Sequence, residues 1–332
     1  MRFNGKTPSQ QRPNIHAWSA ALATALLLAA CGGGGEASPT TDVKTGSFLD
    51  AAVQGLTYET ATQSGTTDAT GQFKYKDGET VTFKLYGSVL SASVGYNVLT
   101  PGDTGVEETD LDAIVNQLRF LQTIDTDANP ANGINLPTFS GDFAVNFKQS
   151  IENFETDAAV TAFLAENASG QALVSVQSAV EHFNGTVQGV TDTTPVLNLS
   201  GKTLRQVHTD SLCENEVEAI ATLEFGATSV VFKGTDGFQN SNGTCTPSPD
   251  ETETFEYSDP ELAGEPLLAC ATGPCSYKEA NGLEYGLDSD GRTVIELFWH
   301  TPGSKKISLI KRVLIDPEFD YRATFKDTLT WE

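Results

Sequence analysis

The sequence predicts an α+β, β-rich chain with a small antiparallel β-domain, a short helical bundle segment and a C-terminal antiparallel β-barrel or sandwich. Three observations predict this class. Apolar and polar residues alternate over residues 46–98, apolar residues recur at helical spacing over residues 99–190, and alternation returns over residues 196–332. About 300 residues follow the N-terminal segment, enough for several units with cores of their own.

The first block carries the turn chemistry of short strands. Polar and aromatic residues alternate from Gln72 to Lys76, Asp77-Gly78 follows, and alternation resumes from Thr80 to Leu85. Asp-Gly between two alternating runs is a strong hairpin signal. We therefore expect a hairpin within a small β-domain at residues 46–98.

The second block changes period from two to about 3.6. Thr109 and Asp112 stand where an N-terminal cap is expected. Apolar residues at this spacing form a stripe along one side of a helix. Stripes of this kind are typical of the packed faces of a small helical bundle rather than of cofactor sites. The four predicted stripes are Leu111, Ile114, Val115, Leu118 and Leu121; Phe147, Ile151 and Phe154; Val160, Phe163 and Leu164; and Val176, Ala179, Val180 and Phe183.

The third block returns to strands separated by turns at Asp288–Gly291 and Pro302-Gly303. Seven or eight strands without a helical stripe predict an antiparallel barrel or sandwich, and the spacing leaves the two alternatives open. The alternating sets are Ala219, Ala221, Leu223 and Phe225; Phe255 and Tyr257; Leu283, Tyr285 and Leu287; Thr293–Trp299; Ile307–Ile310; and Tyr321, Ala323 and Phe325, continuing to Leu329 and Trp331.

Residues 1–30 have the order of parts of an export signal. Three basic residues come first, an apolar stretch runs from Ala17 to Ala30, and Leu28-Ala29-Ala30 directly precedes Cys31. The apolar stretch is short for a permanent membrane helix. An ordinary secretory signal followed by a chance cysteine, or a short membrane anchor, is the alternative.

The segment from Leu28 to Cys31 resembles the lipobox of bacterial lipoproteins. The resemblance implies cleavage before Cys31 and acylation of its thiol and new amino group, with palmitate-like chains that hold the protein on a membrane. Gly32, rather than Asp, follows the cysteine. By resemblance to lipoprotein sorting in Gram-negative bacteria, this favours the outer membrane. The Gly-, Ser- and Thr-rich residues 31–45 read as a flexible tether.

The charge excludes some partners. Without residues 1–30 the chain keeps 17 basic and 44 acidic residues, a formal charge of −27. Nucleic acid and anionic lipid surfaces carry the same sign and are poor partners. Between residues 100 and 190 only Arg119 and Lys148 are basic, which favours cations as small partners there. Acidity that keeps an exported protein in solution is the alternative.

Four cysteines remain once Cys31 is used by the anchor, and they allow three pairings. We favour Cys213 with Cys245, and Cys270 with Cys275, because an oxidising envelope permits both disulfides. Zinc binding is the alternative, but the sequence has no close C-x-x-C pair.

A family resemblance covers roughly residues 46–190. Gly55–Tyr58, Ser64–Asp68 and Gly71–Tyr75, then Asn116–Ile134 and Ala179–Phe183, are similar to the opening module of uncharacterised proteobacterial surface lipoproteins. The resemblance implies a compartment and a β-plus-helical architecture, and it carries no activity. Residues 196–332 show no family.

One loop has the composition of a calcium site. Oxygen-bearing side chains at Asp125, Asp127, Asn129 and Asn132 could converge on one Ca²⁺. The loop departs from an EF-hand, because Gly133 stands at the ninth position rather than the sixth and no Glu closes the loop. The alternative is that Asp and Asn only cap the preceding helix and satisfy the turn.

The sequence shows no nucleophile elbow, Walker loop or metalloprotease motif, so we expect no enzyme. His182, His208 and His300 are the histidines that follow Cys31, and His182 reads as a packed or capping residue. The favoured function is a lipid-anchored outer-membrane lipoprotein, facing the periplasm or the cell surface, that binds an envelope protein or a glycan. The alternative is a carrier of an apolar molecule or lipid in a C-terminal barrel lined by Phe255, Tyr257, Tyr285, Phe298, Trp299, Tyr321 and Phe325.

Overall fold

The computed structural model describes residues 42–104, 110–141, 143–168, 170–189, 199, 201–215, 217–257, 268–269, 276–277, 281–287, 290–300, 306–316 and 321–330. Several predictions concern residues outside these ranges. They are the signal and lipobox with Cys31, the tether up to residue 41, the cap at Thr109, the pair Cys270 and Cys275, Asp288 and Ser289 of one predicted turn, the turn at Pro302-Gly303, and Trp331.

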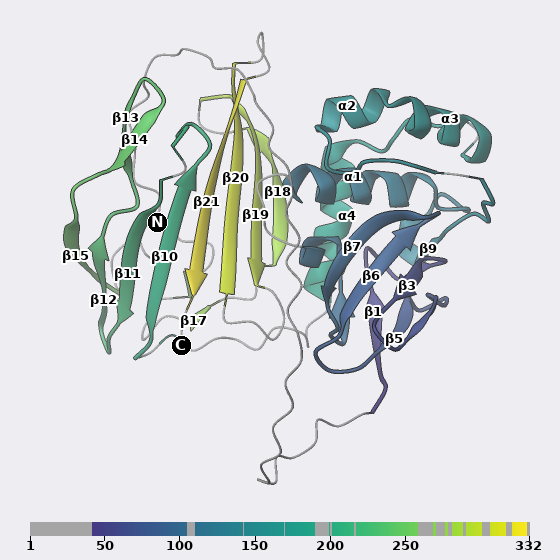
Figure 1. The fold of residues 1–332 in the computed structure, drawn as a ribbon, viewed down its shortest axis with the longest axis horizontal. Helices are drawn as coiled ribbons and strands as arrows, with labels where there is room; N and C mark the ends of the chain where they lie inside the picture. The colour runs from purple at the N-terminus through teal and green to yellow at the C-terminus, as the bar shows by residue number, and fades with distance from the viewer. Residues whose placement is uncertain are drawn as a thin grey trace, which may run out of the picture.

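The N-terminal β-module consists of two small sheets (Figure 1). One has the strand order β4-β3-β6-β7 and the other the order β5-β1-β8. The strands are β1 (Lys44–Phe48), β2 (Val53–Gln54), β3 (Thr57–Glu59), β4 (Ser64–Thr66), β5 (Gln72–Tyr75), β6 (Thr80–Leu85), β7 (Ser88–Val94) and β8 (Val98–Leu99).

The two sheets pack through aromatic rings. Phe83 of β6 lies with its ring centroid 4.5 Å from that of Phe48 in β1 and 5.0 Å from that of Phe73 in β5. The predicted hairpin at Asp77-Gly78 is wrong, because β5 pairs with β1 whereas β6 pairs with β3 and β7. The turn carries the chain from one sheet to the other, which lets both alternating runs direct their apolar residues into one shared core.

The helical module follows. Its elements are η1 (Pro101–Thr104), α1 (Asp110–Thr123), η2 (Pro130–Asn132), β9 (Ile134–Asn135, parallel to β2), α2 (Ile151–Thr156), α3 (Ala158–Asn167) and α4 (Val176–Gly189). The residues of the four predicted apolar stripes are buried, apart from Val176, which is partly buried and packs against the second core. Phe147 of the second stripe lies in the turn before α2 rather than on a helix. Ser150 and Asp157 cap α2 and α3 by accepting hydrogen bonds from backbone N–H groups of the first turn.

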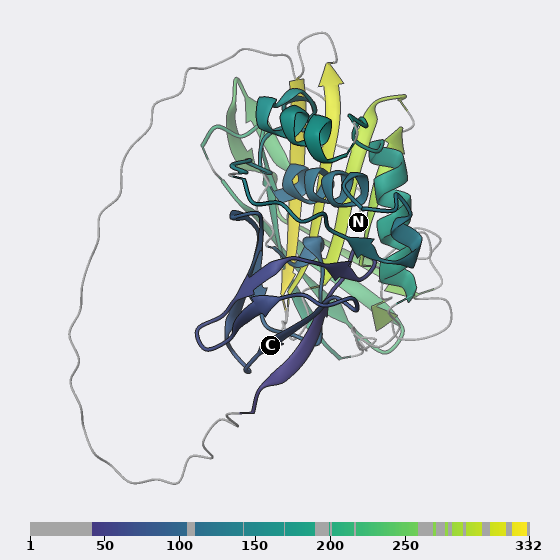
Figure 2. The same cartoon turned by 90° about the vertical axis from the view of Figure 1, so that its right-hand side faces the viewer.

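Helix α1 is enclosed on every side. It lies between α2 and α3 on one side and the β-module on the other (Figures 1 and 2), and every residue from Leu111 to Thr123 is buried. Ala113, Phe120 and Leu121 join the core of the β-module. Leu111, Ile114, Val115 and Leu118 join a second core with α4, β18 and β19. The sequence predicted one apolar stripe, and the structure buries the polar face as well.

The polar side chains of α1 hold the surrounding segments. Asn116 Nδ2 donates to the carbonyls of Phe147 and Gln149, both at 2.9 Å. Gln117 Nε2 donates to Leu90 O of β7 at 2.7 Å. The amide nitrogens thus satisfy backbone oxygens of loops that would otherwise be buried without a donor.

The C-terminal half forms one eight-stranded antiparallel sheet with the order β15-β12-β11-β10-β21-β20-β19-β18. Its strands are β10 (Thr203–Asp210), β11 (Ala219–Phe225), β12 (Ser229–Gly234), β15 (Glu251–Glu256), β18 (Gly282–Leu287), β19 (Thr293–His300), β20 (Lys306–Asp316) and β21 (Tyr321–Thr330). Two strand pairs of the described C-terminal residues lie outside it: the hairpin of β13 (Phe238–Ser241) with β14 (Thr244–Pro247), and the pair of β16 (Leu268–Ala269) with β17 (Ser276–Tyr277).

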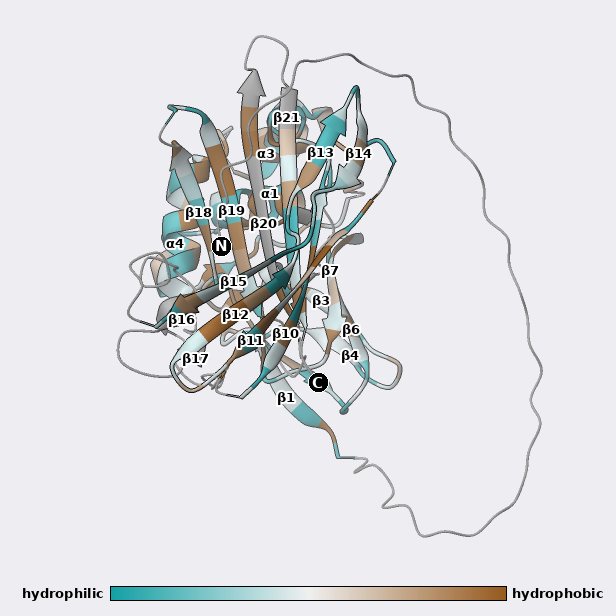
Figure 3. Ribbon diagram, turned by 90° about the vertical axis from the view of Figure 1, so that its left-hand side faces the viewer, coloured by the Kyte–Doolittle hydropathy of each residue, from teal (hydrophilic) through white to brown (hydrophobic). Residues whose placement is uncertain are grey.

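The predicted β-rich α+β class is confirmed, and the sheet is open. Within the described strands, β15 and β18 form its two edges and no ladder joins them, so the arrangement is sandwich-like rather than a closed barrel. The sheet is strongly twisted: β11 and β12 run diagonally across the direction of β19 and β20 in Figure 3.

Opposite faces of the sheet are buried at its two ends. At the β18–β19 end, Leu283, Ile295, Leu297 and Trp299 pack against α1 and α4. At the other end a third core covers the opposite face, as the pairing register shows. Its members are Leu199, Leu204, Ala221, Leu223, Phe225, Val230, Phe232, Phe255 and Tyr257.

A buried hydrogen bond joins the helical module to this sheet. Trp299 Nε1 donates to Asp103 Oδ1 at 2.9 Å, while the amide and hydroxyl of Thr100 donate to Asp103 Oδ2. Burial raises the pKa of Asp103 to about 6 despite these donors. Residues almost 200 positions apart are thereby fixed to each other.

We expect Asn116→Ala to lower the free energy of unfolding by about 1–3 kcal/mol, because two buried carbonyls lose their donor. Urea denaturation measures the change. Asn167→Ala is the matched control: its amide bonds to a carbonyl of its own helix, and its effect should be clearly smaller. Equal effects of the two variants would contradict an anchoring role for α1.

Candidate functional site

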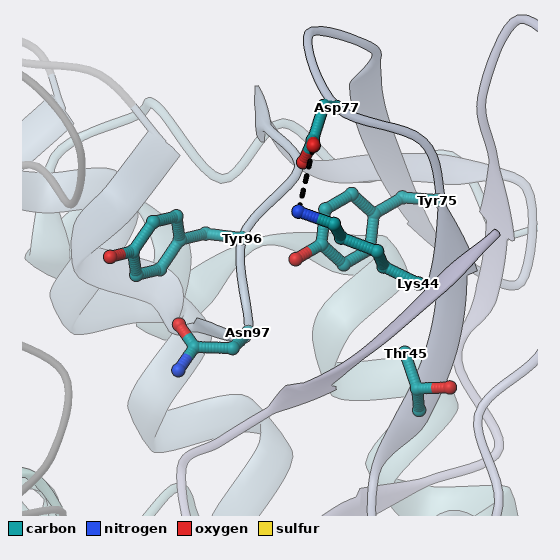
Figure 4. A pocket seen from close by; sticks show the side chains of 6 residues that line it. All are labelled: Lys44, Thr45, Tyr75, Asp77, Tyr96 and Asn97. Carbon is teal, nitrogen blue, oxygen red and sulfur yellow. Dashed lines mark ion pairs between the residues drawn. The ribbon is translucent and has the colours of Figure 1, made fainter. Parts of the chain in front are cut away.

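An open pocket of about 440 Å³ lies at one end of the β-module (Figure 4). This volume falls in the range of small-molecule sites. Strands β1 and β5, the turn after β5 and the segment before β8 supply its lining. We call it the β1 pocket; its lining residues are Lys44, Thr45, Tyr75, Asp77, Tyr96 and Asn97.

Two glycines allow the close backbone approach that forms the β1 pocket. A Cβ on Gly46 would collide with the carbonyl oxygen of Tyr96 and the ring of Phe73, and one on Gly95 would collide with the ring of Tyr75. The segment carrying Tyr96 is fixed further by the Ser47 N–H, which donates to Asn97 O at 2.9 Å. Larger residues at either glycine would displace the pocket wall.

Lys44 and Asp77 bridge the pocket. Lys44 Nζ lies 2.7 Å from Asp77 Oδ2, with both side chains about half exposed, and the bond raises the pKa of Lys44. Lys74 Nζ donates to Thr45 Oγ1 at 2.6 Å. This second bond lies on the opposite face of β1, because Lys44 pairs with Tyr75 whereas Thr45 pairs with Lys74. The pocket therefore offers an ion pair and an amide beside tyrosine rings, a combination that suits a polar ligand.

The sequence did not single out the β1 pocket. Its residues come from three short segments, and no spacing rule connects positions 44, 75 and 96. The only local signal is the presence of Gly46 and Gly95 beside aromatic or polar residues. These glycines can be assigned to a pocket wall only once the pairing of the strands is known.

Beneath β1 a buried acid lies beside a histidine. Gln122 Nε2 donates to both oxygens of Asp50, at 3.1 and 3.2 Å, and His182 Nε2 lies 4.0 Å from Asp50 Oδ1. Asp50 is fully buried, and this raises its pKa to about 8. Burial also lowers the pKa of His182. Both side chains are therefore uncharged near neutral pH, and His182 is packed, in keeping with the sequence interpretation.

His208 lies on the large sheet, opposite Asp327. Its Nδ1 is 3.0 Å from Asp327 Oδ1, which also accepts a hydrogen bond from Gln206 Nε2 at 2.7 Å. Burial alone would lower the pKa of His208, but Asp327, with Asp210 and Asp236 nearby, raises it. The imidazole contacts the rings of Phe238 and Phe325, with centroid distances of 5.6 and 6.4 Å. The ion pair is partly exposed, since 14% of the His208 side chain and 23% of the Asp327 side chain face solvent.

In the predicted calcium loop, the carboxylates accept hydrogen bonds from the loop itself. Asp125 takes the N–H groups of Asn129 and Asn135, and Asp127 takes the N–H of Asn129 and the amide of Asn132. Within the described residues, no group of three or more His, Cys, Asp and Glu is placed to hold a metal ion. Calcium binding stays a prediction.

The predicted disulfide between Cys213 and Cys245 is confirmed, with the Cα atoms 5.3 Å apart. It ties the β13–β14 hairpin to the loop after β10. Asn215 reinforces the link by donating to Cys245 O and accepting from the Cys245 N–H, at 2.8 and 2.9 Å.

Four of the aromatic residues predicted to line a carrier cavity pack in or against cores. Phe298 is buried and Phe325 is partly buried beside His208, and neither is among the residues of the three cores. Phe255 and Tyr257 belong to the third core, and Trp299 stacks on Phe183 with centroids 6.0 Å apart. Tyr285 packs against the core shared with α1.

Comparisons with protein-family models, with curated proteins and with solved structures find no match to this chain. In the described part of the chain, no helix is both long and apolar enough to span a membrane.

We expect Asp50→Asn to change how stability depends on pH. The raised pKa means that the unfolded chain releases the Asp50 proton near pH 4, whereas the folded chain keeps it until about pH 8. The free energy of unfolding of the wild type should therefore fall by about 1.4 kcal/mol per pH unit over that interval because of this group. The free energy of unfolding of the uncharged variant should not show this fall.

The test is urea denaturation of wild type and variant from about pH 5 to 8. The free energy of unfolding of Asp50→Asn, relative to that of the wild type, should rise by about 2 kcal/mol or more between these pH values, allowing for other titrating groups. Asp250→Asn, at an exposed position, serves as control and should follow the wild type. Parallel curves for Asp50→Asn would show that Asp50 ionises normally.

Proposed function

We propose that the chain is a lipid-anchored outer-membrane lipoprotein that binds an envelope component without catalysing a reaction. The β1 pocket would be its binding site. The observation that carries the proposal is the position of this pocket: β1, which lines it, starts 13 positions after Cys31.

The short tether would keep the β1 pocket near the lipid surface. A Gly-rich chain of 13 residues has a root-mean-square span of about 20 Å. The strand that leaves the tether is also the strand that carries Lys44 and Thr45. Ligands attached to, or assembled at, the same membrane would therefore meet the pocket at high effective concentration.

The chemistry of the β1 pocket supports binding rather than turnover. Its lining contains one carboxylate, Asp77, which is paired with Lys44, and neither histidine nor cysteine. The His208–Asp327 pair lies on the large sheet and does not line this pocket. Robust hydrolysis of ester, peptide or glycoside substrates by the purified mature chain would overturn the proposal.

The carrier of an apolar molecule is the second candidate. It needs an enclosed apolar cavity, whereas the described strands form an open sheet and four of the predicted lining residues, Phe255, Tyr257, Tyr285 and Trp299, pack in or against cores. No observation in the described residues favours it over binding at the β1 pocket.

We expect Cys31→Ala to release the protein from the membrane, as unprocessed or unattached material, because the acceptor for the acyl chains is lost. Fractionation of cells followed by immunoblotting measures this, with Cys213→Ala as a cysteine control that keeps the anchor. A Cys31→Ala variant that still fractionates with the outer membrane would contradict the proposal. Protease shaving of intact cells distinguishes surface from periplasmic display.

A further inference from the structure

The β1 pocket has the lining of a sugar site. Its six lining residues include two tyrosines, and none has an aliphatic side chain. A sugar ring presents a flat face of C–H groups and a rim of hydroxyls, so it needs an aromatic surface together with several donors and acceptors. An apolar peptide side chain would need an apolar recess, which this lining does not provide.

Tyr96 supplies the aromatic surface. Its ring is half-buried because it packs against the core of the β-module, so part of it is fixed and part faces solvent. The backbone on both sides is tied down, by Gly95 N–H donating to Glu79 O at 2.8 Å and by Asn97 O accepting from the Ser47 N–H. A ring that is already ordered loses little conformational entropy on binding.

Asn97 supplies a donor and an acceptor from one exposed amide. Its backbone is fixed by the hydrogen bond to β1, while its side chain lines the pocket beside Tyr96 (Figure 4). This arrangement suits two neighbouring hydroxyls, since an amide can accept from one and donate to the other.

Asp77 completes the polar rim. Thr45 follows Lys44 in β1, so its hydroxyl lies on the opposite face of the strand, where it accepts a hydrogen bond from Lys74. Asp77 is held by Lys44 through Oδ2, and carboxylate oxygens accept more than one hydrogen bond. The ion pair is half exposed, so a hydroxyl can replace water on it at little cost.

We propose that the β1 pocket binds a saccharide, with the ring face of one sugar unit on Tyr96 and its hydroxyls bonded to Asn97 and Asp77. This inference rests on the proposed function, and it names the chemistry of the ligand. A peptide is the competing occupant.

The test uses residues 32–332, which lack Cys31 and therefore the acyl anchor, on an array of immobilised bacterial oligosaccharides, followed by isothermal titration calorimetry with the best-bound sugar. Tyr96→Ala should weaken binding at least tenfold, about 1.4 kcal/mol, and Asn97→Ala severalfold. Asn153→Ala, an exposed asparagine on α2, is the control and should bind like wild type.

Thermal unfolding of each variant separates loss of binding from loss of fold. Asn97→Ala keeps the inference testable if Tyr96→Ala proves unstable, because the Asn97 side chain is exposed. An array that retains no oligosaccharide, or equal sugar affinity in wild type and Asn97→Ala, would overturn the inference. If no sugar binds but the anchored protein cross-links to an envelope protein, the saccharide inference fails and the proposed function stands.

Discussion

The fold depends on the burial of helix α1 on every side. A helix with a polar face is ordinarily placed at a surface, but here Asn116 and Gln117 point into the protein and hold backbone carbonyls of the loop before α2 and of β7. Each buried amide requires a partner, so these segments cannot separate from α1 without leaving polar groups unsatisfied. The β-module and the C-terminal sheet are both arranged around this helix, with one core on each side of it.

The same arrangement accounts for the buried acids and for the rigidity of the candidate site. Asp50 follows β1 and meets Gln122 of α1, while Asp103 precedes α1 and meets Trp299 of β19. Burial raises the pKa of both carboxyls because it disfavours the charged form, and this effect exceeds the opposing one of the hydrogen bonds that they accept. Strand β1 is thus attached to α1 at its inner end, and its outer end lines the pocket. A site built on such a strand is held in place before a ligand arrives.

The sequence predicted much of the fold and little of the site. Alternation and helical spacing identified β11, β19 and the apolar side of α1, because burial of one face leaves a period in the sequence. Periodicity assigns polar residues to solvent, so the burial of Asn116, Gln117 and Gln122 could not be predicted. Asp77-Gly78 has the composition of a hairpin turn, yet the strands on either side of it pair with other strands, because packing between the two sheets decides the pairing. The β1 pocket unites residues 44, 75 and 96, and only strand pairing brings them together.

Hydrogen exchange of backbone amides at increasing urea concentration tests most directly whether α1 joins the two cores into one cooperative unit. The decisive comparison is between amides of β6, in the core of the β-module, and amides of β19, in the core shared with α4. The account predicts that both sets merge with those of α1 at one free energy of opening. Separate opening of β6 and β19, at clearly different free energies, would show that the two halves fold independently and would contradict the account.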